Sequence, residues 1–236
     1  MRDKRHWDEF CNSLSKELVA DNIEVLPFDT LGNGDNNQLE SPLCITDYAK
    51  ALLLQLPASN YCIIGLSMGG MIALEMARLA PSMVAKVVVI NASASNLSPW
   101  YLRFNLIALL NAYWCRTKAE DVHWLEATAL YISSEQHCNS EVLAKRWSQF
   151  RVEGRVSLRN ALRQLWACAR YRCSHSLQQP VFVFSGRLDQ LVAPSCSKAM
   201  AKHYHCRLIE FEQAGHDISI DVSAALTAQL KKALLR

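Results

Sequence analysis

The stretch YCIIGLSMGGMIAL, residues 61–74, decides the fold predicted for this chain. An apolar run over 61–65 leads into Ser67, which has glycines two positions before and after it, and a helical pattern follows over 69–79. An apolar strand, a tight turn and a helix form the setting in which G-x-S-x-G lifts a serine hydroxyl clear of a sheet. The start of that helix, with the N–H of Met68, faces any oxyanion that forms beside Ser67. We therefore treat Ser67 as the candidate nucleophile and Met68 as a candidate oxyanion donor.

The glycines of this motif suggest a close approach of the backbone. We expect that Gly65 and Gly69, which lack side chains, allow the strand and the helix to pack closely around a strained serine. The weaker alternative is a glycine-rich turn in which the serine is incidental.

Apolar runs alternate with helical patterns along most of the chain. This alternation predicts an α/β fold, a mostly parallel sheet flanked by helices, in which ligands bind at the carboxyl ends of the strands. The segment between about 99 and 175 shows only helical spacing, so we expect a core made of 1–98 and 176–236 and a helical cap over 99–175. The predicted strands are 23–28, 61–65, 84–90, 181–185 and 207–211, and the predicted helices are 5–19, 45–56, 69–79, 194–203 and 218–235.

A nucleophilic serine needs a base, and the base needs an acid that orients it, in the chain order serine, acid, histidine for this setting. Asp189 and His216 each follow a predicted strand, so both belong at the same sheet edge as Ser67. Asn91 holds the equivalent place after strand 84–90 but carries no negative charge. Asp217 is expected to cap the final helix rather than to serve His216.

These motifs resemble those of the α/β-hydrolase superfamily. GLSMGG (65–70) matches the nucleophile elbow of that family, SGRLDQLV (185–192) its acid loop, AGHD (214–217) its histidine loop, and FDTLGNGDN (28–36) the loop after its fourth strand. The resemblance implies a small serine hydrolase, similar to microbial carboxylesterases, that needs neither metal nor cofactor. It says little about the substrate, because one fold hosts many activities.

One part of the family pattern is missing from the sequence. The resemblance implies a third strand and a His-Gly type loop, which supplies a second oxyanion N–H, just before the helix that begins near Arg5. We expect their absence to leave a gap in the sheet and a half-built oxyanion hole, which costs on the order of 10²–10³ in turnover. One hypothesis is that Met1 is not the natural start, and a weaker one is that strand 23–28 shifts to close the gap.

Two further patterns lie in the predicted cap. The run WYLRFNLIALLNAYW (100–114) fits either an apolar acyl pocket or, more commonly, the core of the cap itself. Arginines recur at intervals of four and suggest a solvated helix face rather than a site for a substrate carboxylate. They are Arg151, Arg155, Arg159 and Arg163.

The composition limits the classes of partner. The chain has 236 residues, a net charge of +3 and half hydrophobic residues, which argues against nucleic acid and against an anionic membrane. Nine cysteines without a CxxC pair favour a reduced, cytoplasmic protein. We expect a monomer or homodimer that hydrolyses an ester of a small or medium apolar acyl group. The alternatives are a non-catalytic binding protein of the same fold, and a thioesterase or lyase that uses the same triad.

Overall fold

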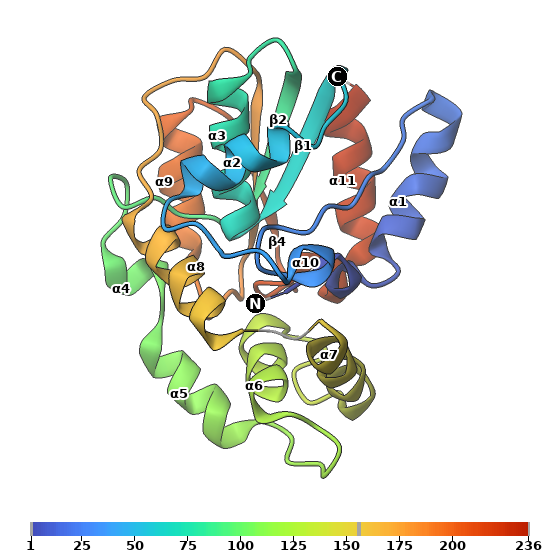
Figure 1. The fold of residues 1–236 in the computed structure, drawn as a ribbon, viewed down its shortest axis with the longest axis vertical. Coiled ribbons are helices and arrows are strands. Elements are labelled where there is room, and N and C mark those ends of the chain that lie inside the picture. The colour runs from blue at the N-terminus through green and yellow to red at the C-terminus, as the bar shows by residue number, and fades with distance from the viewer. Residues whose placement is uncertain (1, 155–156, 236) are drawn as a thin grey trace.

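Four parallel strands form the sheet of the computed structural model, which describes residues 2–154 and 157–235 (Figure 1). They are β1 (Tyr61–Leu66), β2 (Val84–Ile90), β3 (Val181–Gly186) and β4 (Leu208–Phe211), and they pair in the order β1-β2-β3-β4. The register sets Ile64 beside Val88, and Val89 beside Val183. Because all four strands run the same way, the residues that follow them gather at one edge. The predicted parallel sheet flanked by helices is confirmed.

Helices cover both faces of the sheet, because alternate side chains of β2 and β3 enter two separate cores. Val87, Val89 and Val183 face a core that includes α2 (Ile45–Leu53), α3 (Met68–Leu79) and α9 (Pro194–His203). Val88 and Phe184 face the other core, with α1 (Phe10–Leu18) and α11 (Ser223–Leu235). Burial on both faces explains why β2 reads as an unbroken apolar run.

The predicted strand over 23–28 is wrong. Residues 23–30 belong to no helix or strand, although Ile23 and Val25 are partly buried and pack against the core beside α1. Their alternation resembles a half-buried strand, but a ladder needs a neighbour, and within the described residues β1 pairs with β2 alone. The segment therefore does not shift to close the sheet. Short 3-10 turns flank this part of the chain at Lys4–Trp7, Val19–Asp21 and Gly34–Asn36.

In the described part of the chain, five helices lie between β2 and β3 and form what we call the helical insertion (Figure 1, green to yellow). Backbone hydrogen bonds join it to the core at the start of α9: Asn105 N–H donates to Leu191 O, and Ala193 N–H donates to Leu102 O. The helices are α4 (Trp100–Arg103), α5 (Leu106–Cys115), α6 (Trp124–Ser133), α7 (Glu141–Glu153) and α8 (Leu158–Arg170).

The prediction that the apolar run 100–114 forms the core of the insertion is wrong. Within α4 and α5 only Arg103 and Ala112 are buried, while most of the large apolar side chains face outward. The expectation of a core followed from helical spacing, which identifies a helix but not the surface that its apolar face meets.

The arginines spaced by four do not share one helix face. Arg151 lies on α7 and pairs with the buried Glu126, whereas Arg159 and Arg163 lie on α8 and pair with Glu40. Arg155 lies outside the described residues. The predicted solvated face is therefore wrong for Arg151 and Arg163, whose side chains are mostly covered.

The final predicted helix, 218–235, is divided in two. A short α10 (Ile218–Asp221) is followed by the single residue Val222, and α11 begins at Ser223. At the end of α10, the Asp221 side chain accepts the N–H of Gly215 in the loop after β4.

Candidate active site

Ser67 occupies a strained turn between β1 and α3. Its φ is 54° and its ψ is −115°. Residues other than glycine rarely adopt such a left-handed φ. The N–H of Ser67 donates to Ile90 O at 2.8 Å, which ties the turn to the end of β2. Backbone strain of this kind is found where a structure must hold one reactive group in place.

The glycines around Ser67 divide their roles differently from the prediction. A Cβ on Gly65 would lie 2.1 Å from Gly69 O, so the close approach of strand and helix does require Gly65. A Cβ on Gly69 meets nothing within 4 Å, whereas one on Gly70 would lie 2.9 Å from the side chain of Val89. The close approach thus depends on Gly65 and Gly70, and the role assigned to Gly69 is wrong.

Asp189 and His216 are joined by a hydrogen bond between Nδ1 of the imidazole and Oδ2 of the carboxylate, at 2.7 Å. The other oxygen of Asp189 accepts the N–H groups of Leu191 and Val192, each at 2.9 Å. Both side chains of the pair are almost fully buried. The carboxylate is therefore fixed by three hydrogen bonds, and it directs Nε2 of the ring away from itself.

Asn91, which directly follows β2, connects the end of β3 with the loop that follows β4. Its Nδ2 donates to His216 O at 2.8 Å and to Gly215 O at 3.2 Å, and its Oδ1 accepts Gly186 N–H at 2.9 Å. Since Ile90, its neighbour, accepts the Ser67 N–H, the turn of Ser67 and the loop of His216 are both anchored at the end of β2. The sequence excluded Asn91 as the acid and missed this role. Its place directly after a strand was the available signal.

Asp221 fastens the His216 loop to the helical insertion. One carboxylate oxygen accepts Gly215 N–H at 2.7 Å and Glu135 N–H at 3.0 Å, while the other accepts Ser134 Oγ–H and Gln136 N–H. Nothing in the local sequence distinguishes Asp221 from an ordinary helix carboxylate, and this role was not predicted.

Asp217 stands at the N-cap position of α10, as expected, but its side chain makes no capping hydrogen bond. It pairs instead with Arg2, which also donates to Ser133 Oγ at 2.7 Å and lies 4.1 Å from the ring centroid of Trp147. Burial lowers the pKa of Arg2 to about 10. The Asp217 N–H donates to Ser133 O at 2.7 Å, so α6 supports this side of the loop.

The helix α3 begins at Met68, whose N–H belongs to the first turn and so has no partner within the helix. An N–H at this position can donate to a group outside the helix. On the N-terminal side, Lys4 N–H donates to Asp29 Oδ1 at 2.6 Å, and Asp35 N–H donates to Asp29 Oδ2 at 2.9 Å. The buried Asp29 thus binds the start of the described chain to the loop of the FDTLGNGDN motif.

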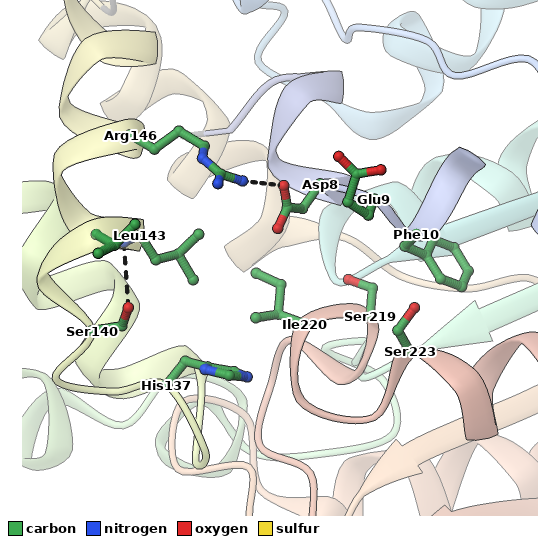
Figure 2. A pocket seen from close by; sticks show the side chains of 11 residues that line it. Asp8, Glu9, Phe10, His137, Ser140, Leu143, Arg146, Ser219, Ile220 and Ser223 are labelled. Carbon is green, nitrogen blue, oxygen red and sulfur yellow. Dashed lines mark hydrogen bonds and ion pairs between the residues drawn. The ribbon is translucent and has the colours of Figure 1, made fainter. Parts of the chain in front are cut away.

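A cavity of about 270 Å³ lies between α7 and the part of the core formed by α1 and α10 (Figure 2). Arg146 and Asp8 form an ion pair at its rim, and Ile220 and His137 point into it from other sides. Ser67, Asp189 and His216 are not among its lining residues. In the part of the chain that the structure describes, no three His, Cys, Asp or Glu side chains are grouped to hold a metal ion.

Comparisons with known proteins give one family model, a curated relative and solved structures of similar fold. The family model described as "alpha/beta hydrolase fold" matches residues 5–222. "Putative carbamate hydrolase RutD" of Cronobacter sakazakii is 29% identical over 221 residues, which is 87% of this chain and 78% of the relative. Among solved structures, the Exiguobacterium antarcticum esterase superposes with a TM-score of 0.74 at 16% identity and covers 99% of this chain and 88% of its own. A thermophilic esterase from Thermogutta terrifontis gives 0.65 at 18% identity, with 98% and 85% covered.

Proposed function

Because the chain belongs to the α/β-hydrolase fold family, we propose that it is a serine hydrolase that cleaves an ester of a small or medium apolar acyl group. The membership supports hydrolysis as the class of reaction. The 2.7 Å hydrogen bond between His216 and Asp189, at the same sheet edge as the strained Ser67, is the observation that carries the proposal.

The proposed reaction has two steps. Ser67 Oγ attacks the ester carbonyl while His216 Nε2 takes the hydroxyl proton, and the imidazolium then returns that proton to the departing alcohol. Water, deprotonated by His216, attacks the acyl-enzyme, and the imidazolium returns that proton to Ser67 Oγ as the acid is released. Asp189 holds the ring in the tautomer that leaves Nε2 free to accept, and it stabilises the positive charge that forms on the ring.

The oxyanion of each tetrahedral intermediate is stabilised by the Met68 N–H and the positive end of α3. In this proposal, apolar side chains of the helical insertion line the site for the acyl group. We keep the division into a core, 1–98 and 176–236, and a cap, 99–175, as part of this proposal. The hydrogen bonds from α4 and α6 to the loops of Asp189 and His216 support it.

Carbamate hydrolysis is the second candidate, because the bacterial relative that covers most of this chain carries that name. The same nucleophile and base would attack a carbamate carbonyl. Competing p-nitrophenyl esters and p-nitrophenyl carbamates, compared by kcat/KM, distinguish the two, and the proposal expects the ester to be preferred.

We also propose that the protein is located in the cytoplasm. All nine cysteines are free, which suits the cytoplasm. None of the helices described for this chain is both long enough and apolar enough to cross a bilayer.

Labelling with a fluorophosphonate, read by intact mass, tests the nucleophile. We expect one adduct on the wild-type chain, none on Ser67→Ala, and full labelling of Ser82→Ala, an exposed serine that precedes β2 at the far edge of the sheet. A folded wild-type chain that stays unlabelled contradicts the enzyme and favours the non-catalytic binding protein. Labelling without hydrolysis of any p-nitrophenyl ester favours the thioesterase or lyase.

A further inference from the structure

The helix α8 presents its polar side to the protein and its apolar side outward. Asn160 and Gln164 are 7% and 1% exposed, and both bond to Ser41: its N–H donates to Asn160 Oδ1 at 3.0 Å, and its Oγ accepts from Gln164 Nε2 at 2.9 Å. On the opposite side, Leu158 and Leu162 are 68% and 58% exposed. This is the reverse of a surface helix in an ordinary domain, whose apolar stripe faces the core.

The helix α5 also turns large apolar side chains outward. Ala112 is its one buried residue, while Ile107 is 81% exposed and Trp114 69% exposed. In Figure 1, α8 lies beside α4, and α5 lies below both of them on the same side of the molecule. Large apolar surfaces that remain in water usually mark a contact with another molecule.

We propose that the outward apolar faces of α4, α5 and α8 form the contact between two copies of this chain. This inference does not depend on the proposed catalytic activity, because none of these side chains takes part in the triad. We call the surface the insertion face. Its residues are Trp100, Tyr101, Leu106, Ile107, Leu110, Trp114, Leu158, Leu162, Leu165 and Trp166.

The area of the insertion face matches that of a standard dimer contact. Burying an aromatic side chain covers about 150–250 Å², so the four aromatic residues, which are 53% to 69% exposed, offer roughly 400–600 Å². The six aliphatic side chains add on the order of 200–400 Å². The total of roughly 600–1,000 Å² brackets the ~800 Å² per partner of a stable interface.

The charges beside the insertion face favour a second copy over a lipid surface. Helices α4, α5 and α8 contain no acidic residue, and the arginines of α8 have partners in their own chain. Arg159 and Arg163 pair with Glu40, and the guanidinium of Arg170 lies 5.4 Å from the ring centroid of Trp166. An anionic bilayer would gain little from cations that are already paired, whereas an apolar contact between copies needs no further charge.

Sedimentation velocity over a dilution series, with circular dichroism as the folding control, tests this contact. We expect the wild-type chain to sediment at twice 26.6 kDa. An unpaired carboxylate in the contact is costly, so Leu162→Asp and Ile107→Asp should each weaken the dimer by roughly 100-fold or more. Val152→Asp is the matched control, because Val152 is 76% exposed but lies on α7.

The opposite outcomes are as clear. A wild-type chain that stays at 26.6 kDa throughout overturns the proposal, and co-flotation of that monomer with phosphatidylglycerol vesicles would assign the face to lipid instead. A dimer that resists either substitution on the insertion face also overturns it, because the contact then lies elsewhere. If Leu162→Asp does not fold, Leu158→Asp serves in its place, since it lies on the same face of α8.

Discussion

Asn91 holds the backbone carbonyl of His216 at 2.8 Å, from a position directly after the strand residue that accepts the Ser67 N–H. The end of β2 is thus the shared support of the proposed base and nucleophile. Because Asn91 has a φ of 47°, both its side chain and its left-handed backbone contribute to this arrangement.

Asn91→Asp should lower kcat on p-nitrophenyl esters with little change in KM. The substitution replaces a donor with a carboxylate oxygen that faces two carbonyl groups, a loss of about 1–3 kcal/mol, or roughly 5- to 150-fold in rate. Asn91→Gly keeps the left-handed backbone but lacks the amide, so it should lose a similar factor. Full activity in Asn91→Gly would show that the backbone alone matters.

Gly69→Ala and Gly70→Ala should have opposite effects on stability. A Cβ at Gly69 has open space, so alanine in helix α3 should raise the free energy of unfolding by about 0.5–1 kcal/mol. At Gly70 the Cβ presses on Val89 and Ala92, and overpacking should cost about 1–3 kcal/mol. Urea unfolding of the pair measures both, and equal shifts would contradict the geometry.

Asp221→Asn should destabilise the His216 loop and the insertion together. The carboxylate accepts four hydrogen bonds, and an amide in its place turns an NH₂ group toward one pair of donors, at a cost of about 1–3 kcal/mol. Hydrogen exchange should increase both in 134–137 and in 214–217. Glu212→Gln, which affects an exposed pair with Arg187, is the control and should change stability by less than about 1 kcal/mol.

The chain should lose stability as the pH falls below about 6.5. Burial between Trp147 and Phe150 lowers the pKa of His6, and the charge of Arg2 acts in the same direction, against the opposing carboxylate of Asp3. The unfolded chain then binds a proton that the folded chain does not, so the stability is complete above the unfolded pKa and falls as the pH drops toward the folded one.

Melting temperatures at neutral and mildly acidic pH measure this loss, and His6→Phe should reduce it. The pKa of His123 is also lowered by burial, so His123→Gln serves as the comparison. If His6→Phe leaves the acid sensitivity unchanged, the effect arises at another group.

The sheet and the pairing of Asp189 with His216 were accessible from sequence because each depends on local signals. The strand β2 and the helix α9 begin and end at the predicted residues, since a β-branched run and an initial proline mark them strongly. A polar residue in the loop that follows a parallel strand lies near the carboxyl edge of the sheet, whatever surrounds it. That rule brought Asp189 and His216 together, and it leaves their catalytic roles as predictions.

The predictions that failed concern features that depend on neighbours distant in sequence. Residues 23–28 have the alternation of a strand, but no strand lies beside them. The period of α8 shows that one side is apolar, yet only the folded chain reveals that Ser41 draws the polar side inward. Gly69 and Gly70 are equivalent in sequence, and only the packing of α3 on β2 separates them.

The hydrogen bonds between the helical insertion and the loops of Asp189 and His216 bear on how this chain could be re-engineered. Transplanting the insertion of a relative onto this core would remove the partners of Asp221, Asp217 and Leu191 at once. A chimera that exchanges the insertion alone should therefore lose the alignment of base and acid, whereas one that carries residues 189–193 and 214–221 along with the insertion should keep it. The unit of exchange in this protein is larger than the unbroken segment between two strands.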